Sequence, residues 1–372
     1  MRLPELTELQ SRGTLKWTRY PAEILPMWVA ESDFGTCPEV KHSLIDAVER
    51  EAFGYPPDSS GLGEALADFS LQQYGWAPKP EHVFAIPDVV RGVWLAIEHF
   101  TAPDSAIILP TPSYMPFLEF SSLIGREVFT IDAYNGIDLN DVEHCLQRGA
   151  RSIILVSPYN PLGYTFDREY LHELANLIAR YDARIIADEI HAPLVYEGTN
   201  IPVASVSDTA AAVTITVTAT SKAWNIAGLK CAQMVFSNPD DVAQWSKVHP
   251  IVREGVSTLG LIAAEACYRA DPTFISEQLA VLAANKRKLM SELPNIMPGV
   301  VATDPAATYL MWLDFRNTPI ADRPAAQLLE RCKIALNEGT TFGPGGAGHA
   351  RLNFACTPAT LDAALERFSK AF

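Results

Sequence analysis

The chain has 372 residues, of which 48% are hydrophobic, so it can bury a large core; its length favours two domains or one large domain with an appendage. The formal net charge of −15 argues against a general affinity for nucleic acid or anionic membranes, because no basic run compensates it. We therefore expect an acidic globular protein whose partners are neither nucleic acid nor membrane.

The N-terminal sequence and the cysteines indicate in which cellular compartment the protein is found. The opening stretch MRLPELTELQSRGTLKWTRY has no apolar run like that of a signal peptide, and no later stretch approaches the roughly eighteen apolar residues of a membrane helix. The six cysteines are scattered, without a C-x-x-C pair or a histidine cluster at metal-ligand spacing. We expect a cytoplasmic protein with reduced thiols and no metal site.

Residues 1–35 form a proline-rich lead-in that ends in the run LPMWVAESDF. Its extended, proline-bounded character suits a segment that crosses a cleft, although Trp28 could equally be a core residue. A helical pattern, EVKHSLIDAVERE, follows and leads to a Gly/Pro loop that contains Tyr55. Taken alone, Tyr55 is typical of a packing residue.

Residues 82–100 predict a strand, a turn and a helix, with Asp88, Val89 and Val90 at the start of the helix. A helix start offers unpaired N–H groups and the positive end of the helix dipole, which together favour a phosphate, although every helix has such an end. The next apolar strand ends in a proline-punctuated loop with Tyr114, where binding sites of α/β sheets usually lie.

Two further strands end in polar groups. Residues 151–166 run into the turn S-P-x-N-P-x-G, whose prolines and glycine would fix Asn160 with little freedom. An apolar strand then leads directly to Asp188, Glu189 and His191. Two acids at the end of a core strand are costly unless they are satisfied, so a functional interpretation is favoured over a surface turn.

Lys222 is the only cation of residues 217–229, between predicted strands at residues 211–220 and 231–236. A solvated surface lysine is the alternative interpretation. Its neighbours, however, suit the lining of a cavity: Ser221, Trp224, Asn225 and Gly228. A partly desolvated lysine has a lowered pKa and becomes a usable nucleophile, so Lys222 is a candidate for holding pyridoxal phosphate (PLP).

Alternating strands and helices between about residues 80 and 240 predict an α/β fold with a mostly parallel sheet, followed by a smaller α+β unit. In that unit Arg351 stands just before an apolar strand, after the glycine-rich FGPGGAGH. The expected division is an N-terminal segment crossing the cleft, a large PLP-binding domain, connecting helices and a small C-terminal domain: residues 1–35, 36–250, 251–285 and 286–372.

The motifs MWVAESDF, FGYPP, IPDVVRGVWLAIEHF, TPSYMPF, PYNPLG, DEIHAPLVYEG and SKAWNIAGLK occur in this order along nearly the whole chain. The ordered set resembles fold-type I PLP enzymes of the class I/II aminotransferase superfamily, and within it the MalY/PatB group of C–S β-lyases. The resemblance implies a large domain with a seven-stranded, mostly parallel sheet and a small α+β domain.

The resemblance also implies roles for individual residues. Lys222 would form the Schiff base with PLP, Asp188 would keep the pyridine nitrogen protonated, and Lys222 would also remove the substrate's Cα proton. The other expected PLP contacts are Asn160 and His191 at the ring oxygen, Tyr114 stacked on the ring, and Val89, Val90, Ser221 and Tyr55 at the phosphate. Tyr55, counted among the catalytic residues, would reach over from a second subunit, which implies a homodimer with shared active sites.

The resemblance also implies which residues contact the substrate. Arg351 would bind the substrate α-carboxylate, and Ala30 and Glu31 of the cleft-crossing segment would also contact the substrate. The alternative for Arg351 is a surface ion pair with an acid such as Glu338 or Asp314.

The sequence departs from the superfamily pattern at two positions. Lys230 stands where many members have a phosphate-binding arginine, and it keeps the charge without the two-pronged geometry. Ala219 stands where relatives often have a hydroxyl, so Thr218, Thr220 or Ser221 would have to supply one.

The expected activity is β-elimination of L-cystathionine or another cysteine S-conjugate to a thiol, pyruvate and ammonia. A class I/II aminotransferase would share almost all of these residues, and only the subgroup resemblance favours the lyase. A regulatory PLP-binding protein is a third hypothesis, although no chemical position is missing.

Overall fold

The computed structural model describes residues 1–57 and 60–370, and its centre is a seven-stranded sheet in the order β2-β8-β7-β6-β5-β3-β4. Among these strands β8 alone runs in the direction opposite to the other six. The strands are β2 (Val83–Ile86), β3 (Ala106–Thr111), β4 (Val128–Asp132), β5 (Ala150–Val156), β6 (Arg184–Asp188), β7 (Thr214–Thr218) and β8 (Ala232–Phe236). The α/β fold with a mostly parallel seven-stranded sheet confirms the predicted fold class.

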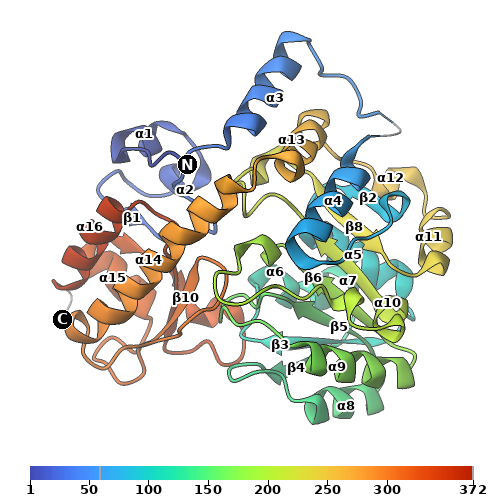
Figure 1. Ribbon diagram of the computed structural model, residues 1–372. Coiled ribbons are helices and arrows are strands. Elements are labelled where there is room, and N and C mark those ends of the chain that lie inside the picture. The colour runs from blue at the N-terminus through green and yellow to red at the C-terminus, as the bar shows by residue number, and fades with distance from the viewer. Residues whose placement is uncertain (58–59, 371–372) are drawn as a thin grey trace.

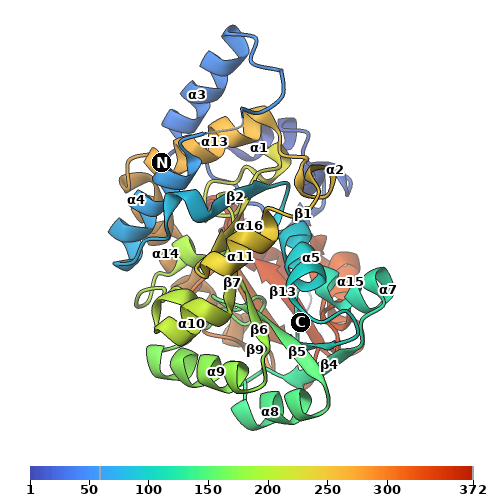
Figure 2. The same cartoon turned by 90° about the vertical axis from the view of Figure 1, so that its right-hand side faces the viewer.

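The central strands β5, β6 and β7 are buried over almost their whole length because helices cover both faces of the sheet. Figure 2 shows α8 and α9 on one side of the strands and α5 on the other. The helices of this part are α4 (Leu62–Tyr74), α5 (Val89–Phe100), α6 (Met115–Leu118), α7 (Phe120–Ile124), α8 (Leu139–Gln147), α9 (Arg168–Arg180), α10 (Asp208–Val213), α11 (Pro239–Trp245) and α12 (Pro250–Arg253). One hydrophobic cluster fills the space between the sheet and most of these helices, whereas the buried side chains of α4 belong to another cluster.

The small domain contains a four-stranded sheet in the order β12-β13-β10-β9, with antiparallel pairing. Its elements are β9 (Val301–Ala302), β10 (Leu310–Asp314), α15 (Pro324–Cys332), β11 (Ile334–Ala335), β12 (Asn337–Glu338), β13 (His349–Asn353) and α16 (Pro358–Phe368). A second hydrophobic cluster joins it to the N-terminal elements and the long helices. In Figure 1 this domain lies beside the large sheet, with α14 running along it.

The N-terminal segment belongs to both parts of the molecule. Its strand β1 pairs in parallel with β11 of the small domain, and α3 then projects from the body at the top of Figure 1. The remaining helices are α1 (Leu6–Ser11), α2 (Leu15–Thr18), α3 (Pro38–Glu49), α13 (Thr258–Arg269) and α14 (Thr273–Ile296), with β1 at Leu25–Pro26. Short 3-10 turns lie at Pro80–His82, Ala192–Leu194, Val203–Ser205, Ala227–Leu229 and Gly339–Phe342.

Three details differ from the sequence predictions. Residues 211–213, predicted as the start of a strand, end helix α10, whose first turn is capped by the Ser207 hydroxyl accepting from the N–H of Ala210. Arg351 lies inside β13 and not before it. The expected boundary at residues 285 and 286 falls inside the continuous helix α14.

All six cysteines are buried and have free thiols. Within residues 1–57 and 60–370, no helix combines the length and apolar character needed to cross a membrane.

Candidate active site

A cavity of about 360 Å³ lies at the carboxyl ends of the parallel strands, where ligand sites of α/β sheets are expected. Ten of the residues predicted from the sequence line it: Ala30, Val89, Val90, Tyr114, Asn160, Asp188, His191, Ser221, Lys222 and Lys230. Segments that are far apart in the sequence therefore meet at one site.

Lys222 follows β7, and its Nζ donates to the carbonyl oxygen of Ala30 at 3.0 Å. Burial, and to a smaller extent the positive charge of Arg351, lower the pKa of Lys222 from 10.5 to about 8, against the opposing charges of Glu31 and Asp188. A substantial fraction of the amine is therefore neutral near physiological pH, which is the form that attacks a carbonyl carbon or removes a proton.

Asp188 ends β6, and its Oδ1 accepts the backbone N–H of Ile190 at 3.1 Å. Burial raises the pKa of Asp188 to about 7, while the N–H of Ile190 and the charge of Lys222 oppose that rise. A cationic group placed beside this carboxylate would favour its ionised form, because an opposite charge lowers a carboxyl pKa. Asp188 is thus suited to hold a protonated ring nitrogen.

His191 lies three residues further on and is 2% exposed. Its ring packs edge-on against Tyr309, with 5.9 Å between the centroids, and its Nδ1 has no hydrogen-bond partner among the residues the structure describes. Burial lowers the pKa of His191 well below its ordinary value, so the imidazole is neutral. A buried ring nitrogen without a partner is costly in a dry site, which favours a ligand that contacts it.

The start of α5 forms the opposite end of the cavity. Asp88 caps the helix by accepting the N–H of Arg91 at 2.9 Å, and Val89 and Val90 follow as its first residues. Lys230 Nζ lies 3.0 Å from Asp88 Oδ2 and also lines the cavity. The unpaired N–H groups, the helix dipole and the ammonium group together favour an anion here.

Of the three hydroxyl residues that could replace the one absent at Ala219, Ser221 lines the cavity. Thr218 donates to the carbonyl oxygen of Glu189 instead, and Thr220 is fully buried. Tyr114 is half-buried and lines the cavity, held by an edge-on contact with Phe117 at 5.6 Å between centroids. Its ring therefore offers a flat face to a bound group.

Arg351 reaches the site from β13 and is 2% exposed. It donates to Asn160 Oδ1 at 3.1 Å, to the carbonyl oxygen of Trp28 at 3.1 Å and to Asn337 Oδ1 at 2.8 Å. Burial lowers the pKa of its guanidinium to about 10. Within residues 1–57 and 60–370 it makes no ion pair with a carboxylate, so the alternative of a structural pair with Glu338 or Asp314 is wrong.

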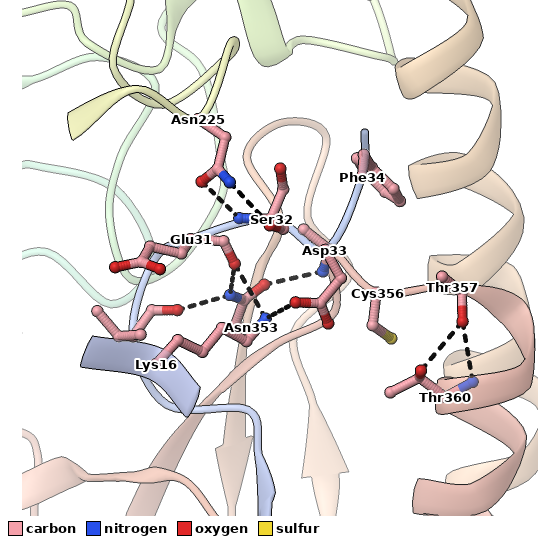
Figure 3. A network of polar contacts seen from close by, with 12 residues as sticks. Lys16, Glu31, Ser32, Asp33, Phe34, Asn225, Asn353, Cys356, Thr357 and Thr360 are labelled. Atoms are coloured by element: carbon pink, nitrogen blue, oxygen red, sulfur yellow. Dashed lines mark hydrogen bonds and ion pairs between the residues drawn. The ribbon is translucent and has the colours of Figure 1, made fainter. Parts of the chain in front are cut away.

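The segment of residues 27–35 closes one side of the site, and polar contacts hold its main chain (Figure 3). Asn353 donates to the carbonyl oxygen of Glu31 at 2.7 Å, and Asn225 makes two hydrogen bonds of 2.9 Å with the main chain of Ser32. Tyr309 donates to Ala30, the same carbonyl oxygen that Lys222 contacts, at 3.1 Å. These roles were not predicted, because an asparagine in a strand or a tyrosine in an apolar run gives no chemical signal.

Three of the predicted residues do not line the cavity: Tyr55, Glu31 and Arg351, of which Arg351 contacts the lining residue Asn160. Tyr55 is 99% exposed and lies in the loop that follows α3. Glu31 is half-buried beside Ala30, with its side chain outside the cavity lining. The role of Tyr55 in the site of a second subunit and the role of Glu31 remain predictions.

Sequence comparison identifies relatives over the full chain. The family described as aminotransferase class I and II matches residues 23–368. The cystathionine beta-lyase of Corynebacterium glutamicum is 54% identical over 369 residues, covering 99% of each chain. The chain belongs to the class I and II aminotransferase family. Within this family, the cystathionine beta-lyase PatB of Bacillus subtilis is 31% identical over 94% of this chain and 92% of its own, which confirms the resemblance to the MalY/PatB group.

A solved structure of the same family has the same fold throughout. It is a crystal structure from Corynebacterium diphtheriae, provisionally assigned as a PLP-dependent beta-cystathionase. The two chains superpose with a TM-score of 0.98 at 52% identity, over 100% of this chain and 98% of that one. The two-domain architecture of this chain is therefore the fold-type I architecture of the family.

The cavity of this aminotransferase-family chain fits PLP by the groups that it offers. Lys222 supplies an amine of lowered pKa, and Asp188 supplies a buried carboxylate with one hydrogen bond from the chain. His191 supplies a buried nitrogen without a partner among the described residues, and the start of α5 supplies donors for a phosphate. An aldehyde, a ring nitrogen, a ring oxygen and a phosphate of one molecule would satisfy all of them.

Proposed function

We propose that this chain is a PLP-dependent C–S β-lyase that cleaves L-cystathionine or a related cysteine S-conjugate. Water is consumed, and the products are a thiol, pyruvate and ammonia. The observation that carries the proposal is the set of Lys222, Asp188 and His191 around one cavity, in a chain 54% identical to a cystathionine beta-lyase along its whole length.

When bound, PLP supplies a conjugated ring that accepts the electron pair left behind as the Cα proton is removed. Asp188 stabilises positive charge at the ring nitrogen and so keeps the ring a strong electron acceptor. Ser221, Lys230 and the N–H groups of Val89 and Val90 hold the phosphate. These residues fix the cofactor and take no part in the proton transfers.

Lys222 moves the proton. Its neutral amine takes the proton from the substrate Cα, and the Cβ–S bond breaks as the electron pair returns toward Cβ. The ammonium group so formed can give its proton to the departing thiolate. Its pKa of about 8 suits both directions near physiological pH, since a catalytic group works best when its pKa lies near the operating pH.

Arg351 orients the substrate. Its guanidinium is held by Asn160, Asn337 and the Trp28 carbonyl, none of which neutralises its charge. A substrate α-carboxylate would therefore be the anion that pairs with it, in the two-pronged geometry that arginine favours. This pair would hold the Cα–H bond of the substrate in line with Lys222.

The experiment that tests the proposal is a panel of S-substituted L-cysteines given to the purified protein with PLP, with pyruvate and thiol measured separately. The lyase predicts both products from L-cystathionine. If no member of the panel yields pyruvate while amino groups pass to an added keto acid, the chain is an aminotransferase and the proposal is wrong.

We also propose that the protein is a homodimer in which Tyr55 contributes to the partner's site. Helix α3 and its following loop project from the body and expose apolar side chains, with Val48 at 50% and Phe53 at 63%, which a second copy would cover. Mixing inactive Lys222→Ala and Tyr55→Ala proteins under subunit exchange would restore about a quarter of the sites if each site draws on both chains. No recovery in verified mixed dimers would contradict the sharing.

For localisation we propose the cytoplasm, because the six cysteines are free thiols, as is usual for proteins of reducing compartments. For the domain division we propose an N-terminal segment, a large PLP-binding domain, connecting helices and a small domain, with α14 packed in the same hydrophobic cluster as the small domain. Limited proteolysis and cell fractionation test these two assignments.

A further inference from the structure

One carbonyl oxygen, that of Ala30, is shared by the active-site lysine and a buried tyrosine. Lys222 Nζ donates to it at 3.0 Å, and the Tyr309 hydroxyl donates to it at 3.1 Å. Ala30 and Lys222 both line the cavity, whereas Tyr309 lies just before β10 with its side chain fully buried. Two hydrogen bonds to the same atom therefore link Tyr309 to Lys222.

The main chain at Ala30 does not depend on the tyrosine hydroxyl for its place. Asn353 Nδ2 donates to the carbonyl oxygens on either side, that of Val29 at 2.6 Å and that of Glu31 at 2.7 Å. Figure 3 shows the contact with Glu31. The N–H of Glu31 also donates to the carbonyl oxygen of Val29 at 2.8 Å. Without the hydroxyl, the Ala30 carbonyl would therefore still face Lys222.

The hydroxyl of Tyr309 can be removed without removing its ring. The ring packs edge-on against His191, with 5.9 Å between the centroids, and phenylalanine would keep this contact. Burial raises the pKa of Tyr309 above its ordinary value, so the hydroxyl keeps its proton and acts as a donor. Tyr309→Phe therefore removes one hydrogen-bond donor and little else.

Sharing the oxygen affects the charge of Lys222. A carbonyl oxygen that accepts from an ammonium group stabilises the charged form of the amine, and a better acceptor stabilises it more. An oxygen that already accepts from a hydroxyl offers less electron density to a second donor. Tyr309 therefore weakens the support that Ala30 gives to the ammonium form of Lys222 and so favours the neutral amine.

Other groups that act on this amine are unchanged by Tyr309→Phe. Burial lowers the pKa of Lys222 most, and the charge of Arg351 lowers it too. Glu31 and Asp188 raise it. The charged and titratable groups around Lys222 and Tyr309 are Asp188, His191, Glu31, Arg351 and Tyr114, with the pair of Lys230 and Asp88 at the far end of the cavity.

We propose that Tyr309 is a positioning residue that shares the Ala30 carbonyl oxygen with Lys222 and thereby keeps the lysine amine ready to react. It rests on the proposed function only in the assignment of Lys222 to PLP, which a lyase and an aminotransferase have in common. Tyr309 itself touches neither the cofactor site nor the substrate site and acts through the lysine.

The test is the pH dependence of covalent PLP incorporation into the full-length, cofactor-free protein, in which the lysine nitrogen bonds to the aldehyde carbon and water is released. In Tyr309→Phe the inflection of the rate lies at higher pH than in the parent. The initial rate at pH 7 is about threefold lower, and the rates above the inflection are equal.

Tyr159→Phe is the matched control. Tyr159 is buried outside the cavity lining, and its hydroxyl donates to a carbonyl oxygen, that of Pro112, at the same 3.1 Å. Both variants lose one buried hydroxyl, so a general loss of stability would affect them alike. The control keeps the inflection of the parent.

A folded Tyr309→Phe protein whose inflection is unchanged or lower overturns the inference, whatever its melting temperature. If that variant does not fold, 3-fluorotyrosine placed at position 309 decides. Its more acidic hydroxyl is a stronger donor and lowers the inflection, and an inflection that stays or rises overturns the inference. A parent protein that takes up no PLP covalently overturns the proposed function as well, whereas normal uptake without pyruvate overturns the lyase alone.

Discussion

The two walls of the cavity are assembled over very different distances in the sequence. On the large-domain wall, Asp188 ends β6, and Lys222 comes shortly after the end of β7. On the other wall, where Ala30 lines the cavity, Arg351 holds the neighbouring residues: it contacts Asn160 from 191 positions away and Trp28 from 323 positions away. The first wall is built by strand ends and the second by packing between distant segments.

This difference separates two kinds of function. The large-domain wall holds the groups that bind the cofactor and move protons, so changes there should remove the chemistry. The other wall orients and selects the substrate, so changes there should alter KM and specificity while the cofactor stays bound.

Lys222→Ala should lower cystathionine cleavage by about 10²–10⁴-fold or more, because it removes the group that moves the Cα proton. The same change should abolish covalent attachment of PLP while the protein stays folded. Borohydride reduction followed by mass spectrometry measures the attachment. Lys247→Ala, at an exposed position, is the control, and an adduct that persists in Lys222→Ala would place the link at another residue.

Asp188→Asn should keep PLP bound but lower kcat by about 10²-fold, the size expected when one preorganised charge is lost from an active site. Glu189→Gln is the matched control: this adjacent carboxyl accepts the N–H of Val203 at 2.8 Å and does not line the cavity. In steady-state kinetics, the kcat values of the two variants should differ by more than tenfold. Equal losses would mean that the carboxyl facing the cavity has no special role.

Arg351→Lys should lower kcat/KM by well over tenfold, because lysine keeps the charge but loses the two-pronged pairing with a carboxylate. PLP occupancy and the melting temperature should stay nearly the same. Arg316→Lys serves as the control, since Arg316 pairs with Asp314 in the same domain at 60% exposure. Normal turnover by a destabilised Arg351→Lys protein would instead indicate a purely structural arginine.

The pKa of about 8 at Lys222 sets a pH dependence for loading of the cofactor. Because the neutral amine is the reactive form, the initial rate of covalent PLP incorporation into cofactor-free protein should rise nearly tenfold per pH unit below about 8 and level off above it. Stopped-flow absorbance measures this rate. A rate that keeps rising to the ordinary lysine pKa of 10.5 would show that burial does not lower the pKa.

Asn225→Gly should raise KM for L-cystathionine by only about fivefold, with PLP binding unchanged. The change removes two hydrogen bonds to Ser32 but tolerates the left-handed backbone at this position, where φ is +57°. Steady-state kinetics with L-cystathionine measure KM, and a titration with PLP measures the affinity for the cofactor. A loss of PLP affinity of the same size would erase the distinction between the two walls.

The same difference explains what the sequence could predict. Asp188, Asn160 and Lys222 were identifiable because each lies at or just after the end of an apolar strand or within a rigid turn. The hydrogen bonds from Tyr309 to Ala30 and from Asn353 to Glu31 join residues 279 and 322 positions apart, and no local pattern encodes them. Residues 211–213 were misassigned because small and β-branched residues suit a strand, whereas the Ser207 cap extends the helix.

The measurement that tests the central claim most directly is the amount of pyruvate formed per active site from excess L-cystathionine, with PLP present and every keto acid left out. A lyase regenerates its cofactor, so the account predicts many equivalents of pyruvate, with homocysteine and ammonia in equal amounts. An aminotransferase would stop after about one amino group per site. A reaction that ends at one equivalent without pyruvate would contradict the account.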